Sequence, residues 1–248
     1  MILLLAAVSY FAKGVVGAAS AIVFNAGLLT ALALGLGGDF TLLDGLYWVA
    51  LADCFSSVLM AVTLRKQLKL EKFVVLMLAG MLPVQLVFTL LLTRLELNWL
   101  QMLLAVSVIG AGVYLAAQRN PRAAPPPVIE RAAMPVGAIA GVLSGLFGMA
   151  GPVIFLLVAK ADPDPSVFRR RMVVISTIAA VIRVATIALQ SQFTSQRLAW
   201  FGIAVPVILV FLALGMWAHR RVKPPVFRVV LGVLVILAGL GALLRSVT

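Results

Sequence analysis

The stretches FAKGVVGAASAIVF (residues 11–24) and VLSGLFGMAGPVIF (residues 142–155) decide how this 248-residue chain folds. Aligned on each other, they place Gly14 on Gly145 and Gly17 on Gly148. Both lie in the middle of long apolar runs, and glycine is unfavourable inside a helix because of its conformational freedom. We therefore predict that a helix breaks at each stretch, in two related halves of the chain.

Apolar runs fill most of the remaining chain. Hydrophobic residues make up 63% of the sequence and charged residues 11%, whereas soluble domains carry roughly 45–50% and about 25%. A helix needs roughly 20 residues to cross the hydrocarbon core of a bilayer. We predict an all-α polytopic membrane protein with membrane segments at 1–35, 45–64, 73–93, 99–118, 133–159, 172–190, 198–218 and 227–244.

The stretch QRNPRAAPPPVIER (residues 118–131) interrupts these runs near the middle of the chain. Its four prolines and its charges argue against a spanning helix and favour an extended hinge. We predict an N-terminal membrane repeat at 1–118, a cytoplasmic Pro-rich linker at 119–132 and a C-terminal membrane repeat at 133–248.

The net charge of +12 is concentrated in four connectors, at 65–72, 118–131, 160–171 and 219–228. Cytoplasmic loops of membrane proteins are enriched in Lys and Arg, so this charge predicts topology and argues against nucleic-acid binding. Segment 133–159 then has both ends in the cytoplasm. Either it enters and returns as a re-entrant hairpin of two half-helices, or one basic loop breaks the rule. With a hairpin and three crossings in each half, the repeats are inverted.

The two glycine-rich motifs, each followed by a helix with a hydroxyl pair, resemble the TauE/SafE family of sulfite and sulfonate exporters. The segments TLRKQLKLEK (63–72) and GMLPVQLVF (80–88) also resemble this family, and the resemblance covers nearly the whole chain. It implies a secondary transporter in the bacterial inner membrane that moves sulfite, thiosulfate, sulfoacetate or a similar anion. Lys13 and the alanines and serine at 18–21 depart from the glycines usual in the family.

Internal repeats in transporters place the substrate site where the repeats meet, near the bilayer midplane. Hairpin tips there expose backbone N–H groups and helix N-termini, which attract anions. The alternatives are that the glycines let helices pack closely, and that the hydroxyls bond carbonyls of their own helices. Gln85 is a further polar residue in a membrane segment. The candidate substrate-binding residues are Gly14, Gly17, Asn25, Ser56, Ser57, Gly145, Gly148, Gly151, Ser176, Thr177 and Arg183.

Three ionisable residues, Lys13, Asp53 and Arg183, lie within predicted membrane segments. Such residues are costly in a bilayer and are functional hypotheses by default. The planar guanidinium of Arg183 suits a sulfonate or carboxylate, while Lys13 and Asp53 are candidates for ion coupling or a charge pair. The alternative is a structural ion pair of Asp53 with Arg183 or Lys13.

The inventory of chemical groups is small. One cysteine, one histidine and no phosphate-binding loop or metal-ligand cluster predict a protein that is not an enzyme and needs no cofactor or metal. The expected partners are a small anionic substrate, the lipid bilayer, H⁺ or Na⁺ as a coupling ion, and a second copy in a homodimer. A transporter of small carboxylates and a non-transporting membrane subunit remain the alternatives.

Overall fold

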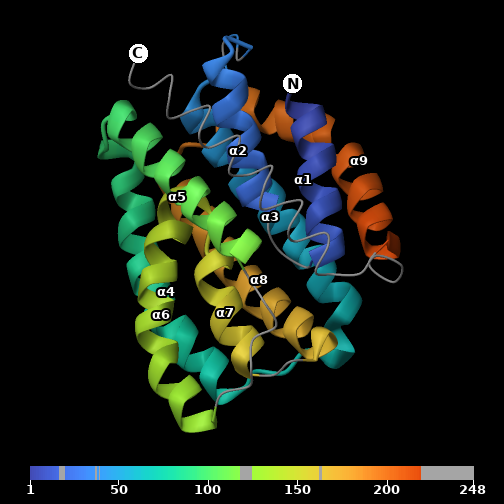
Figure 1. Cartoon of the computed structure of the whole chain (residues 1–248). Helices are drawn as coiled ribbons and strands as arrows, with labels where there is room; N and C mark the ends of the chain where they lie inside the picture. The colour runs from blue at the N-terminus through green and yellow to red at the C-terminus, as the bar shows by residue number, and fades with distance from the viewer. Residues whose placement is uncertain (17–19, 37, 39, 118–124, 162–163, 219–248) are drawn as a thin grey trace. The chain divides into compact units, whose positions relative to one another are not determined.

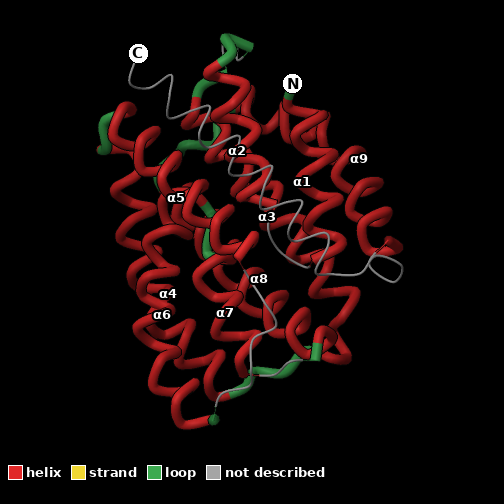
Figure 2. The backbone as a smooth tube through the Cα atoms, in the orientation of Figure 1, coloured by secondary structure: helices red, strands yellow, loops and turns green. Residues whose placement is uncertain are grey.

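The structure is a computed structural model. It describes residues 1–16, 20–36, 38, 40–117, 125–161 and 164–218. All regular elements in these ranges are helices, joined by short loops (Figures 1 and 2). The α-helices are α1 (Ile2–Val16), α2 (Ser20–Ala33), α3 (Leu42–Leu64), α4 (Lys72–Leu91), α5 (Leu97–Ala117), α6 (Pro126–Phe147), α7 (Gly151–Ala161), α8 (Pro165–Leu189) and α9 (Ser195–Ala218). Two short 3-10 helices follow α3 and α4, at Arg65–Gln67 and Leu92–Arg94.

Many of these helices have the length and composition of membrane spans. Within the described residues, five are long and apolar enough to cross a bilayer, and two shorter helices at the N-terminus are also apolar. The polytopic all-α prediction is therefore confirmed. The predicted segment 227–244 and the connector 219–228 lie outside the described residues. The five spans are Leu42–Gln67, Lys72–Arg94, Pro126–Phe147, Ser166–Leu189 and Ser195–Ala218.

Both predicted helix breaks are present. Helix α6 ends at Phe147 and α7 begins at Gly151, with Gly148 between them in the left-handed region at φ 72°. The backbone N–H of Gly148 donates to Ser144 O at 3.0 Å, so the turn satisfies a carbonyl that the end of α6 would leave unpaired. In the first half α1 ends at Val16 and α2 begins at Ser20; Gly17 lies outside the described residues.

Two predicted helix boundaries were wrong. Helix α6 begins at Pro126, inside the stretch expected to be an extended hinge, because proline is well tolerated in the first turn of a helix, where its N–H is not needed. With 22 residues α6 is also no half-helix. Helix α8 begins at Pro165. The residue before it, Asp164, caps the helix, because its side chain accepts a hydrogen bond from the Ser166 N–H at 2.8 Å. The arginines at 169–171 are therefore helical and not part of a connector.

The chain forms two compact units that do not coincide with its halves. Unit 1 comprises Met1–Ala52, Arg94–Gln118 and Phe193–Thr248, and unit 2 comprises Asp53–Thr93 and Arg119–Gln192. Each unit combines segments of the first and the second half. A compact unit is defined by contacts in space and a repeat by similarity in sequence, so the units do not test the repeats. The repeat boundaries and the inverted relation between the repeats stay predictions.

Unit 2 is built around the pairing of α4 with α6, which lie side by side (Figure 1). Glycines at every fourth position of α6, namely 137, 141 and 145, face the α4 backbone. A Cβ atom at Gly145 would lie 2.7 Å from Gln85 O. Small residues at this spacing let membrane helices approach closely, so the stripe sets the distance between α4 and α6.

Unit 1 contains the α1–α2 hairpin, and α1 also packs along α9. A Cβ atom at Gly14 would lie 2.8 Å from the Cα atom of Gly215 on α9, a second close helix contact based on glycine. The indole ring of Trp48 stacks on the ring of Phe24 with 4.7 Å between centroids. At the start of α3, Asp44 accepts a hydrogen bond from Arg197 Nε at 2.7 Å, which joins α3 to α9.

Candidate functional site

The helix break in unit 2 is accompanied by a buried arginine. Arg183 on α8 is 3% exposed, and its Nη2 donates to Leu146 O at 3.2 Å. Leu146 lies in the last turn of α6, where carbonyls lack partners within the helix and a positive charge is favourable. The structure thus brings Arg183 to the tip between α6 and α7, next to Gly148.

A buried polar network lies on the same helices. Gln85 on α4 donates from Nε2 to Ala179 O of α8 at 2.7 Å, and Ser144 of α6 donates to Gln85 Oε1 at 2.9 Å. Thr89 donates to Gly145 O at 3.3 Å. Ser144 and Thr89 are not among the residues predicted from the sequence. The four-residue spacing from Gln85 to Thr89 indicates that both lie on one face of α4, and this spacing could have identified Thr89.

The two hydroxyl pairs predicted from the repeats meet in unit 2. Thr177 Oγ1 on α8 donates to Ser57 O on α3 at 3.1 Å. Ser56 donates to Asp53 O at 3.2 Å and Ser176 to Val173 O at 3.3 Å, as the alternative of bonds to their own helices predicted. A segment of the first half and a segment of the second half are therefore in contact within this unit.

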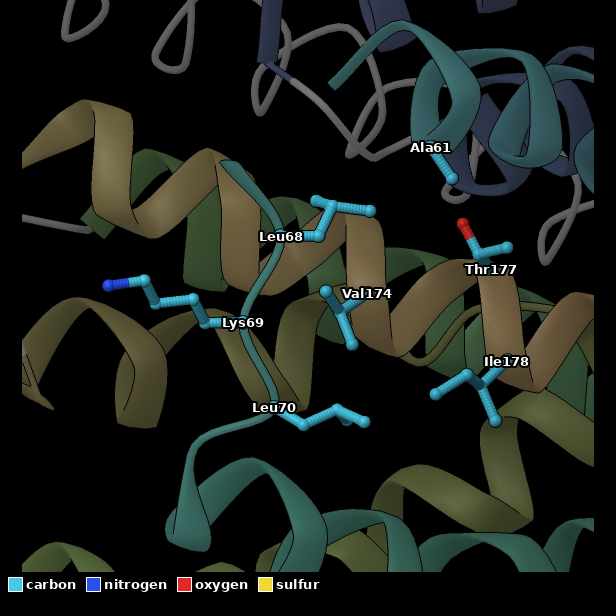
Figure 3. Close-up of a pocket in the computed structure, with 7 residues that line it drawn as sticks. All are labelled: Ala61, Leu68, Lys69, Leu70, Val174, Thr177 and Ile178. Carbon is cyan, nitrogen blue, oxygen red and sulfur yellow. The ribbon is translucent and has the colours of Figure 1, made fainter. Parts of the chain in front are cut away.

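A cavity of about 280 Å³ lies beside Thr177 (Figure 3). Three of its residues come from α8 and three from the connector between α3 and α4. The lining is apolar apart from the Thr177 hydroxyl and Lys69, whose amine points away from Thr177 in Figure 3. The cavity therefore lies beside the basic connector 65–72. Its lining residues are Ala61, Leu68, Lys69, Leu70, Val174, Thr177 and Ile178.

The candidate glycines have different surroundings. Gly14 and Gly145 lie in close helix contacts, which the packing alternative predicted, while Gly148 forms the left-handed turn. Gly151 is the first residue of α7, and a Cβ atom there would have only Phe155 Cζ nearby, at 3.8 Å. Gly151 is therefore the candidate glycine with space next to a helix N-terminus.

The remaining candidates are divided between the units. Lys13 and Asn25 are buried in unit 1, and the Nζ atom of Lys13 lies 5.8 Å from the centroid of the Tyr10 ring. Asp53 is half-buried on α3 at the boundary of unit 2. The pairing of Asp53 with Lys13 or Arg183 stays a prediction. Among the residues that the structure describes, no group of three or more His, Cys, Asp or Glu could hold a metal ion.

Comparison with known proteins assigns the family. The model of the sulfite exporter TauE/SafE family matches residues 2–242. A curated relative, the probable sulfite/organosulfonate exporter TauE of Cupriavidus necator, is 29% identical over 175 residues, which cover 66% of this chain and 63% of the relative. No solved structure matches the chain. Since the family model spans nearly all of the sequence, the chain belongs to the sulfite exporter TauE/SafE family and is a multi-pass membrane protein.

Proposed function

We propose that this chain is a secondary transporter that moves a small organosulfur or sulfur oxyanion, such as sulfite, thiosulfate or sulfoacetate, across the bacterial inner membrane. The family and the name of the curated relative support this class of substrate. The observation that carries the proposal is the buried Arg183 beside the helix break at Gly148. A buried arginine in an apolar span is costly, and such residues mark substrate or ion pathways.

The proposed site lies at the tip between α6 and α7. Arg183 supplies a guanidinium, whose planar arrangement of five donors suits a tetrahedral or trigonal oxyanion. In the first turn of α7 the N–H groups of Gly151 and Val153 need no partner within the helix and lie at its positive dipole end, while Pro152 between them has no N–H. The bond from Arg183 to Leu146 O holds the guanidinium at this tip.

This location is compatible with a site where the two halves meet. Unit 2 takes α4 from the first half and α6 to α8 from the second, and the bonds of Gln85 and Thr177 cross between the halves. Rocking of one half against the other would expose the tip alternately to the two sides of the membrane. Asp53 and Lys13 are the proposed coupling residues for H⁺ or Na⁺, and a homodimer stays a prediction.

Transport into proteoliposomes tests this proposal. We expect uptake of sulfite, thiosulfate or sulfoacetate by the wild-type protein, and loss of that uptake in Arg183→Gln with the protein still inserted. Arg94→Gln is the matched control, because Arg94 is exposed and lies far from the tip in sequence. Uptake of small carboxylates in preference to every sulfur anion would instead favour a carboxylate transporter. Full activity in Arg183→Gln would remove this arginine from the site.

A further inference from the structure

Charged residues at the ends of several helices surround a second cavity in unit 2, with a volume of about 230 Å³. The residues around it lie in the first turns of α4 and α6, in the second turn of α8 and at the end of α7. The cavity is therefore located where apolar spans give way to charged connectors. It is lined by Glu71, Lys72, Phe73, Pro126, Ile129, Glu130, Ala161 and Arg171.

Arg171 lines this cavity, and neighbouring side chains hold it on two sides. The side chain is 10% exposed, its Cζ lies 4.9 Å from the centroid of the Phe73 ring, and its Nε donates to both carboxylate oxygens of Glu71 at 3.1 Å. Its Nη1 is buried and has no hydrogen-bond partner among the described residues. Buried donors normally have a partner. Phe73 and Glu71 therefore hold Arg171 in place, and Nη1 still lacks the partner that a buried donor normally has.

The charges around the cavity indicate which ligand fits. Besides the pair of Arg171 with Glu71, Lys72 Nζ lies 2.6 Å from Glu130 Oε2. Two cations and two carboxylates thus line the cavity. An anion alone would be repelled by the carboxylates, and a cation alone by Lys72 and Arg171. A ligand with both an ammonium and an oxyanion can pair with both kinds of side chain.

The pair of Lys72 and Glu130 can exchange partners easily. The Lys72 side chain is 74% exposed and that of Glu130 is 33% exposed. Exposed ion pairs contribute little to stability because water screens them. Both groups can therefore turn to a ligand without a large loss. In the pair of Arg171 and Glu71 the arginine side chain is only 10% exposed and donates three hydrogen bonds to the carboxylate, so this pair remains as the fixed side of the cavity.

We propose that this cavity binds the headgroup of an ethanolamine phospholipid. The phosphate accepts hydrogen bonds from Arg171 Nη1 and from Lys72, and the primary ammonium donates to Glu130. Helix ends of this kind lie at the level of the lipid headgroups, and charged pockets between membrane helices are known headgroup sites. Phe73 and Ile129 provide apolar contacts for the glycerol part of a lipid. This inference is independent of the proposed transport function.

Short-chain lipids added to the purified full-length protein test the proposal. Dihexanoyl phosphatidylethanolamine is compared with the matching phosphatidylcholine and phosphatidylglycerol and with soluble O-phosphoethanolamine, using melting temperature and retention in native mass spectrometry. We expect phosphatidylcholine to bind about tenfold more weakly than phosphatidylethanolamine, because its quaternary ammonium cannot donate the charge-assisted hydrogen bond to Glu130. O-phosphoethanolamine distinguishes a soluble zwitterion from a lipid.

Variants assign the two ends of the headgroup. Arg171→Gln should lose the binding, and Glu130→Gln, which leaves the pair of Arg171 and Glu71 intact, should remove the preference for phosphatidylethanolamine over phosphatidylglycerol. Arg131→Gln is the control, because Arg131 is the exposed neighbour of Glu130 and does not line the cavity. Equal binding of the three lipids to the wild type, or an unchanged preference in Glu130→Gln, would overturn the proposal. Equally strong binding of O-phosphoethanolamine would overturn the lipid assignment.

Discussion

Gly145→Ala tests whether the glycine stripe of α6 serves packing or ligand binding. A Cβ atom at this position would lie 2.7 Å from Gln85 O, 2.7 Å from Phe88 Cβ and 3.1 Å from Thr89 N. Backbone atoms and a Cβ atom cannot move aside by a change of rotamer, so α4 and α6 have to separate. Inserting a methyl group into a packed interface costs typically about 1–3 kcal/mol.

The control for this variant is Gly202→Ala on α9, where an added Cβ atom would have nothing within 4 Å. Both substitutions gain the same helix propensity, up to about 1 kcal/mol, so the difference between them isolates the steric cost. At about 2–4 °C per kcal/mol for a chain of this size, the melting temperature of Gly145→Ala in detergent should lie at least about 2 °C below that of Gly202→Ala.

Measurements of uptake distinguish the two possible roles of Gly145. If Gly145 serves packing, uptake per folded molecule should change together with stability. If Gly145 contacts the substrate directly, Gly145→Ala should keep its melting temperature and lose uptake. A melting temperature of Gly145→Ala equal to or above that of Gly202→Ala would refute the packing argument.

Three further predictions concern the tip and the ends of the helices. Arg183→Gln should weaken anion binding even when Asp53 is also changed to Asn, measured as a double-mutant cycle of affinity and melting temperature; near-native affinity in the double variant would exclude Arg183 from the site. Gly148→Val should cost about 1–2 kcal/mol, because a residue other than glycine is strained at φ 72°, and should abolish uptake; normal uptake at equal protein levels would contradict this. The hydrogen bond from the Ser166 N–H lowers the pKa of Asp164, so its contribution to stability is complete above the pKa of the unfolded state and is lost as the pH falls through the lower folded pKa. Acid titration of the melting temperature should therefore separate wild type from Asp164→Ala at neutral pH and bring the two curves together in acid; curves that stay apart in acid would argue against the cap.

Several features were predicted correctly because they depend on a few neighbouring residues. The length of an apolar run determines whether a helix can cross a bilayer, and a helix satisfies its own backbone in lipid. The break at Gly148 follows from the freedom of glycine to adopt a positive φ. The start of α6 differs from the prediction although it is also local, because Pro126 lies in the first turn of the helix, where a proline does not break it.

The sequence by itself determined the helical membrane class, the two helix breaks and the set of polar residues in the spans. Only the tertiary structure decided that Gln85 forms hydrogen bonds with Ser144 and Ala179, and that Arg183 donates to Leu146 O at the end of α6. It also decided that each compact unit contains segments from both halves of the chain. The physical reason is that apolar helices all have similar affinities for lipid. Their choice of partner depends on the fit of small residues and on single hydrogen bonds between segments distant in sequence, which a pattern within one segment does not specify.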